Sequence, residues 1–147
     1  MSIPAIGTWE GGYRTRLNDG RGHDVVVDLD RDEGGGDAGT SALELQVLAL
    51  AGCITTIFGL VARRRRLTFE AMSIELGAER PPRAPTITAV SGVLRVTTAA
   101  PAEEVATALT LTLRTCPVGV IFERAGIPVV VRPVITPPTV AAEASRT

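Results

Sequence analysis

The longest apolar run of the chain, residues 45–62, carries no charge and has Cys53 near its middle. Ser41 and Glu44 before it have the spacing of a capping box, which begins a helix. Four arginines, residues 63–66, follow it, where the helix dipole favours cations. The pattern therefore predicts a helix from Ser41 to these arginines. Since apolar side chains occupy both the Cys53 face and the opposite face, we expect this helix to be covered on all sides.

The segment before this helix predicts a β-hairpin. Apolar and aromatic residues alternate with polar ones over residues 9–17, and the turn sequence 18–20 precedes a β-branched run at residues 23–29. Residues 30–40 are rich in Asp and Gly and predict a connection with positive φ angles.

Two strands are expected after the arginines, at residues 68–76 and 86–98, because a proline-rich break at residues 81–85 separates two β-branched or alternating runs. Gly92 within the second run indicates a bulge or a close approach of another backbone. These features predict a strand, a loop and a second strand.

The C-terminal third predicts two helices and a strand. Pro101, followed by acidic residues, has the features of a helix start, although the middle of this segment also alternates like a strand. Cys116 and Pro117 begin a short third helix that ends near Gly126. Residues 127–134 form the last expected strand.

These elements, in the order β-β-α-β-β-α-α-β, predict an α+β fold. We expect a single domain over residues 1–135 and a disordered tail over residues 136–147, which are rich in Pro, Ala and Ser. One small sheet cannot cover two apolar helices in a chain of 147 residues. A homodimer, in which a partner's sheet covers the central helix, is therefore expected.

The charge-free run also just reaches the length of a membrane span. Gln46, Thr55 and Thr56 dilute it, and the flanking amphipathic strands would lose their only large apolar partner. We therefore favour burial of this helix inside protein, with no membrane partner.

Composition narrows the choice of function. The chain is 45% hydrophobic but only 3% aromatic, which predicts an aliphatic core. A net charge of −1 and a pI near 5.8 give no general attraction to nucleic acid, and the arginine cluster is explained by the helix dipole. The first residues, from Met1, lack the basic and apolar features of a secretory signal segment. A cytoplasmic location is therefore expected.

The two cysteines are the candidate chemistry. In a reducing compartment, Cys53 and Cys116 are either buried inert thiols or a redox pair that cycles. A metal site is not expected, because His23 is the single histidine and no short chelating pair exists. The Gly-rich segment 34–39 is acidic and lacks the lysine of a phosphate-binding loop.

Four segments resemble the OsmC/Ohr superfamily, named for osmotically inducible protein C and organic hydroperoxide resistance protein. They are Arg21-Gly-His23, residues 35–39, Glu44-Leu45 with residues 49–53, and Cys116-Pro117-Val118. The similarity extends over residues 9–134. It implies an OsmC-like fold in an intertwined homodimer, with sheets around two central helices. It also implies that Cys53 attacks a peroxide and that Cys116 resolves the sulfenic acid as a disulfide.

The sequence departs from this family at three positions. Leu43 stands where the hydroperoxide-resistance subgroup has a glutamate that contacts the thiolate, Ala42 replaces a proline, and Gly119 replaces a serine. Glu44 lies on the opposite side of a regular helix from Cys53 and cannot take over that contact. A divergent OsmC-like protein is the closest description.

A thiolate at Cys53 would need a cation, because its apolar neighbours raise a thiol pKa. Arg21 is the preferred candidate, with Arg14 and Arg16 as alternatives, whereas His23 is interpreted as a strand residue. Cys116, at a helix N-terminus, is expected to be the more acidic thiol. The aliphatic side chains expected to bind substrate are Leu50, Ile57 and Leu43.

Three functions stay open on the sequence. The first is a thiol-dependent peroxidase for organic hydroperoxides, which needs no bound cofactor or metal and uses an external dithiol reductant. The second is a non-catalytic OsmC-like dimeric module that binds a small apolar ligand. The third is a different thiol enzyme.

Overall fold

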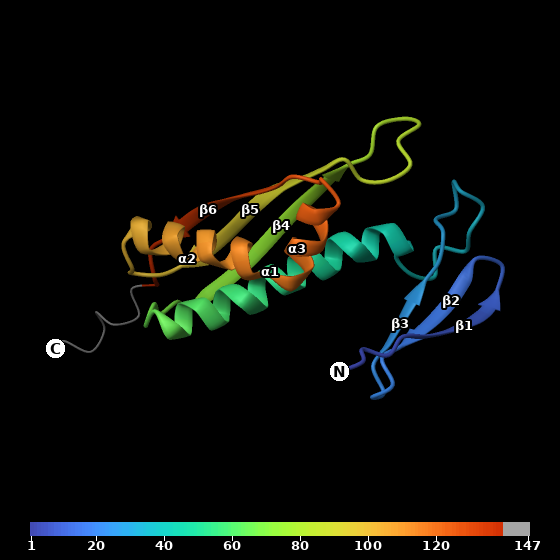
Figure 1. Ribbon diagram of the computed structural model, residues 1–147, viewed down its shortest axis with the longest axis horizontal. Coiled ribbons are helices and arrows are strands. Elements are labelled where there is room, and N and C mark those ends of the chain that lie inside the picture. The colour runs from blue at the N-terminus through green and yellow to red at the C-terminus, as the bar shows by residue number, and fades with distance from the viewer. Residues whose placement is uncertain (140–147) are drawn as a thin grey trace. The chain divides into compact units, whose positions relative to one another are not determined.

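The computed structural model describes residues 1–139, and residues 140–147 of the predicted tail lie outside the described residues. The chain divides into two compact units, one comprising Met1–Leu48 and one beginning at Ala49. Each unit contains one three-stranded sheet, and the helix α1 (Ala42–Arg64) begins in the first unit and ends in the second (Figure 1).

The first unit contains an antiparallel sheet in the order β1-β2-β3, formed by β1 (Ile6–Gly11), β2 (Arg14–Asn18) and β3 (Asp24–Val27). The prediction of a single strand over residues 9–17 was wrong. Gly11 and Gly12, with φ angles of 111° and 55°, turn the chain back on itself in the middle of that run. Apolar alternation continues on both sides of this turn, so the pattern alone did not reveal it.

The connection from β3 to α1 is held together by the buried carboxylate of Asp28. Its Oδ1 accepts the N–H of Leu29 at 2.8 Å, and its Oδ2 accepts the N–H groups of Gly36 at 3.2 Å and Ala38 at 3.1 Å. Gly34, with φ of 87°, supplies a positive φ angle of the kind that the composition predicts. One carboxylate thus satisfies three backbone donors and fixes the Gly-rich segment.

Helix α1 begins with the predicted capping box, which is confirmed. The N–H of Glu44 donates to Ser41 Oγ at 3.2 Å, and the N–H of Ser41 donates to Glu44 Oε2 at 2.7 Å. The helix ends at Arg64, two residues before the end of the arginine cluster, where Arg66 adopts a φ of 58°.

The second unit contains a mixed sheet in the order β4-β5-β6, with β4 (Ala71–Glu79) antiparallel and β6 (Val129–Thr136) parallel to the central β5 (Ala89–Thr97). Helices α2 (Ala102–Thr115) and α3 (Pro117–Arg124) form the crossover from β5 to β6. Figure 1 shows these two helices as one bent connection between the strands.

The core of the second unit contains one stripe of α1. Four residues spaced one turn apart are fully buried: Leu50, Ile54, Phe58 and Ala62. Side chains of β5 and α2 complete this core, among them Val90, Leu94, Val96, Val105, Ala108 and Leu109. The rest of α1 is not buried to this degree, since Leu60 is 47% exposed. The described residues of the second unit therefore do not cover α1 on all sides.

Over residues 1–139 the element order is β-β-β-α-β-β-α-α-β, and the two small sheets and three helices of this part confirm the predicted α+β class. By length and composition, α1 would be able to cross a membrane, and α2 with α3, bent by 65°, would be a broken span. Core helices of globular proteins have the same features, so this observation alone is weak support for a membrane protein.

Candidate thiol site

The two cysteines come together in the second unit. Cys53 lies in α1 and is half-buried, and Cys116 is fully buried between α2 and α3. The two thiols are close enough for Cys53 to raise the pKa of Cys116. Both are free thiols. Residues far apart in sequence therefore form one thiol pair, because α1 and α2 border the same cavity and Cys116 directly follows α2.

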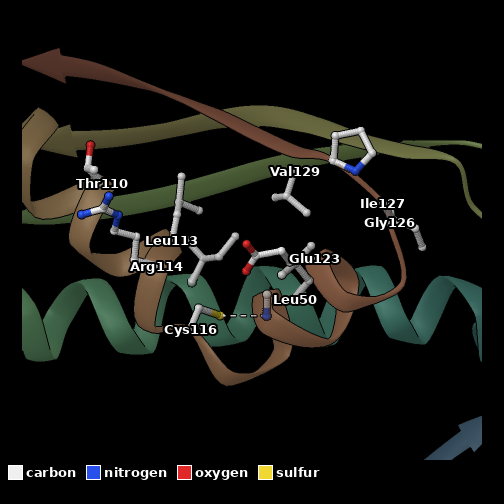
Figure 2. A pocket seen from close by; sticks show the side chains of 12 residues that line it. Leu50, Thr110, Leu113, Arg114, Cys116, Glu123, Gly126, Ile127 and Val129 are labelled. Carbon is white, nitrogen blue, oxygen red and sulfur yellow. Dashed lines mark hydrogen bonds between the residues drawn. The ribbon is translucent and has the colours of Figure 1, made fainter.

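Cys116 is the residue at which α2 ends and α3 begins. Its backbone N–H donates to Thr112 O at 2.8 Å and closes α2, while its Sγ accepts the N–H of Gly119 at 3.4 Å and caps α3 (Figure 2). Pro117 occupies the first turn of α3, where its missing N–H leaves no donor unsatisfied. The Cys-Pro sequence therefore fixes where the sulfur lies.

Burial raises the pKa of the Cys116 thiol from 9.0 to about 11, and the neighbouring Cys53 thiol adds to the rise. The N–H groups of Gly119 and Val118 lower this pKa, but by less. The prediction that the helix N-terminus would make Cys116 acidic was therefore wrong. Removal from water disfavours the thiolate more strongly than two backbone donors favour it.

A cavity of about 530 Å³ lies beside Cys116. Its walls come from α1, α2, α3 and the start of β6, and Figure 2 shows the side chains around it. The apolar part includes Leu50, Leu113 and Val129, and the polar part includes Arg114 and Glu123. The cavity is of a size that small molecules occupy in proteins.

Of the three residues expected to bind substrate, only Leu50 lines this cavity, among the residues that the structure describes. Ile57 is half-buried on α1, one turn beyond Cys53. Leu43 is half-buried in the first unit. Sequence reasoning missed the cavity wall formed by α2, α3 and β6, since the residues were interpreted only as helix and strand positions.

The three candidate cations belong to the first unit. Arg21 lies on the turn between β2 and β3, 77% exposed, with its NH2 3.0 Å from Asp19 Oδ2. Arg14 and Arg16 are 3.8 Å and 3.3 Å from the carboxylate of Glu10. Each guanidinium thus has an acidic partner, and which of them serves Cys53 stays a prediction.

His23 shares the acidic partner of Arg21. Its Nδ1 is 2.7 Å from Asp19 Oδ2, and its backbone N–H donates to Asp19 Oδ1 at 3.2 Å. His23 precedes β3 and is not a strand residue, so that interpretation was wrong. Sequence reasoning assigned Asp19 only to a turn. Its position two residues before Arg21 and four before His23 was the available signal of a shared carboxylate.

Within residues 1–139, no group of three or more His, Cys, Asp or Glu side chains is arranged to hold a metal ion.

The α+β fold brings a thiol in the middle of one helix beside a second thiol at the start of another. This arrangement defines a class of two-cysteine proteins. The chain belongs to the OsmC-like protein family, which matches residues 34–132. The resemblance predicted from the sequence is confirmed.

Solved structures support the same fold. An OsmC-like protein from Mycoplasma pneumoniae superposes with a TM-score of 0.82 at 10% identity, covering 92% of this chain and 98% of that one. An organic hydroperoxide resistance protein OsmC from Legionella pneumophila gives 0.68 at 18% identity, covering 88% and 96%. A putative organic hydroperoxide resistance protein from Vibrio cholerae, with captopril bound in one of its active sites, gives 0.61 at 18% identity, covering 89% and 92%. No curated protein matches the sequence.

Proposed function

We propose that this protein has a redox-stress role and reduces organic hydroperoxides with its thiol pair. The observation that carries the proposal is that the half-buried Cys53 thiol lies close enough to the buried Cys116 thiol to raise its pKa. Membership of the OsmC-like family supports it, as do structural neighbours called organic hydroperoxide resistance proteins.

The roles of the two thiols follow from their surroundings. Cys53, the less buried of the two, attacks the terminal oxygen of the peroxide as a thiolate, becomes a sulfenic acid and releases an alcohol. Cys116, with its pKa raised to about 11, is mostly protonated near neutral pH, but it already lies beside the Cys53 sulfur that it must attack. Its sulfur displaces the hydroxyl of the sulfenic acid, so that a disulfide and water form.

The peroxide step also needs positive charge, because a thiolate attacks while an alkoxide departs. Arg21 is the preferred cation, with Arg14 and Arg16 as alternatives. An external dithiol then reduces the disulfide, and no bound cofactor takes part. We propose a cytoplasmic homodimer as the working form.

Single-turnover oxidation with an alkyl hydroperoxide tests the roles of the cysteines. Cys53→Ala should abolish peroxide consumption, because the attacking sulfur is lost. Cys116→Ser should consume one equivalent and then stop at the sulfenic acid, because no sulfur is left to displace the hydroxyl. Peroxide loss and the mass of the protein are measured together. Consumption by Cys53→Ala at the parent rate would contradict the proposal.

The same assay tests the cation. Arg21→Ala should slow the oxidation step by about 10²-fold, the scale of losing one preorganised charge. Arg31→Ala, an exposed change in the first unit at a residue that is not a candidate cation, is the matched control and should stay near the parent rate. Arg16→Ala tests the alternative cation. A slow Arg16→Ala beside an unaffected Arg21→Ala would reassign the role.

A second candidate function, a non-catalytic module for a small apolar ligand, is favoured by the cavity of about 530 Å³ with its apolar wall. Peroxide turnover separates the two. A parent protein that consumes no hydroperoxide with any dithiol would fit the ligand-binding module.

A further inference from the structure

The turn between β2 and β3 carries Arg21 between two glycines. Gly20 and Gly22 have φ angles of 79° and 96°, which side-chain-bearing residues rarely adopt. Glycines on both sides of a residue also leave the backbone free to take up many conformations. The position of Arg21 in this turn therefore depends on whether another group holds it.

Asp19 is the group that holds Arg21. Its Oδ1 accepts the backbone N–H of Arg21 at 2.8 Å. Its Oδ2 accepts the guanidinium Nε–H at 3.1 Å and lies 3.0 Å from Nη2. One carboxylate thus fixes both the backbone and the side chain of the same residue.

The ion pair leaves part of the guanidinium available to another molecule. A guanidinium carries N–H donors on both of its edges, and Asp19 engages the edge with Nε and Nη2. The Arg21 side chain is 77% exposed, and within residues 1–139 it has no other ion pair. Asp19 therefore orients the guanidinium plane and leaves the donors of Nη1 unused by this contact.

Resting on the proposed function, we propose that Asp19 is a positioning residue for the oxidation step, which acts by holding the Arg21 guanidinium in one orientation. A positive charge stabilises a thiolate and a departing alkoxide best when it is oriented before the reaction begins. An arginine that moves freely in a turn between glycines would lose conformational entropy at the moment of reaction instead. Asp19 removes that loss in advance.

The charge of Asp19 fits this role better than a role in stability. An exposed ion pair contributes little to the stability of a fold. The carboxylate is nevertheless kept ionised, because hydrogen bonds from the His23 side chain and from the backbone N–H of Arg21 hold the pKa of Asp19 well below its usual range. Asp19 is therefore negatively charged at every pH at which a cysteine forms a thiolate.

Asp19 also organises the backbone of the turn, and this structural role can be separated from the ion pair. Its Oδ1 accepts the backbone N–H groups of Arg21 and His23, at 2.8 Å and 3.2 Å. An asparagine oxygen accepts the same two bonds but carries no charge to pair with a guanidinium. Asp19→Asn therefore removes the ion pair and keeps the acceptor that forms the turn.

Single-turnover oxidation of the full-length protein with an alkyl hydroperoxide measures the effect. Asp19→Asn should slow the oxidation step by about 10-fold, less than the roughly 10²-fold loss expected when the charge of Arg21 is removed. Asp30→Asn is the matched control, because Asp30 is exposed in the same unit and its Oδ1 accepts only the backbone N–H of Glu33, at 2.8 Å, among the described residues. Equal rates for Asp19→Asn and Asp30→Asn would overturn the proposal.

A double variant separates action through Arg21 from general damage to the turn. If Asp19 acts by holding Arg21, its charge has nothing left to orient once Arg21 is replaced. Asp19→Asn combined with Arg21→Ala should therefore oxidise at the rate of Arg21→Ala alone. A further slowing in the double variant would overturn the proposal, because Asp19 would then act through another group such as His23.

A nuclear magnetic resonance measurement on the reduced protein tests the contact without peroxide. The Nε–H of Arg21 should exchange with water faster in Asp19→Asn than in the parent, because the hydrogen bond to Oδ2 protects it. Equal exchange would overturn the proposal. A parent protein with a protected Arg21 Nε–H that consumes no hydroperoxide would instead remove the proposed peroxidase, and with it the step that Asp19 serves.

Discussion

At the scale of single residues, two aspartates of the first unit hold its loops in place through hydrogen bonds and ion pairs. Asp28 is only 5% exposed and accepts three backbone N–H groups. Asp19 is at the surface and contacts both Arg21 and His23. The partners of Asp28 lie up to ten positions away, so no short motif indicates them. The partners of Asp19 lie only two and four positions away, and that spacing was the available signal.

Asp19 sets the charge of the turn that carries Arg21. Its hydrogen bond raises the pKa of His23 above 6.5, and the same contact holds the pKa of Asp19 well below 3.8. The contribution of His23 to stability is therefore complete below pH 6.5 and is lost as pH rises through its raised pKa. The contribution of Asp19 is complete above pH 3.8 and is lost as pH falls through its lowered pKa. Salt weakens both, since the groups are exposed.

A nuclear magnetic resonance titration of His23 tests this coupling. In the parent protein the His23 ring should titrate above pH 6.5, and Asp19→Asn should move its pKa back toward that value. Asp24→Asn, a nearby carboxylate change that leaves Asp19 in place, should keep the raised pKa. A His23 pKa that is unaffected by Asp19→Asn would contradict the assignment.

At the scale of helices and strands, the features predicted correctly from the sequence are helix starts and ends that depend on one or two neighbouring residues. The capping box of Ser41 and Glu44 is present, α3 starts at Pro117, and Gly126 follows α3 with a φ of 74°. These signals are local, because caps and prolines act within one helical turn. The ambiguous middle of α2 was likewise decided correctly by its start signals.

The errors came from properties that depend on the folded surroundings. The turn at Gly11 and Gly12 was missed because alternation continues on both sides of it. The acidity of Cys116 was wrong because burial, which the sequence does not display, outweighs the helix start. The cavity was missed because its wall combines four elements that lie far apart in sequence.

The predicted close approach at Gly92 is confirmed and gives a test at this scale. A Cβ atom there would lie 2.0 Å from the backbone oxygen of Glu75 on β4. Gly92→Ala should therefore lower the free energy of unfolding by about 1–3 kcal/mol, the usual cost of overpacking. Gly77→Ala, in β4, is the matched control, because nothing lies within 4 Å of a Cβ at that position. Urea unfolding measures both, and similar midpoints would contradict the role of Gly92.

At the scale of the whole molecule, α1 is the element whose surroundings matter most. Its buried stripe faces the core of the second unit, yet Leu60 is 47% exposed and Leu48 is 57% exposed. Apolar side chains on a helix of this length gain stability when another surface covers them, by roughly 25 cal/mol for each Å² buried. A second copy of this chain has the same exposed apolar positions on α1, so two copies can cover each other. This supports the proposed homodimer.

The dimer predicts a specific response to a charge on α1. Parent protein in light scattering should have about twice the chain mass of 15.4 kDa. Leu60→Glu should raise the dimer dissociation constant at least about 10-fold, because an unpaired carboxylate would be buried at the contact. Thr107→Glu, an exposed change on α2, should leave the mass unchanged. A parent protein that is monomeric at micromolar concentration, with its helix content intact, would remove the homodimer and would require another covering for α1.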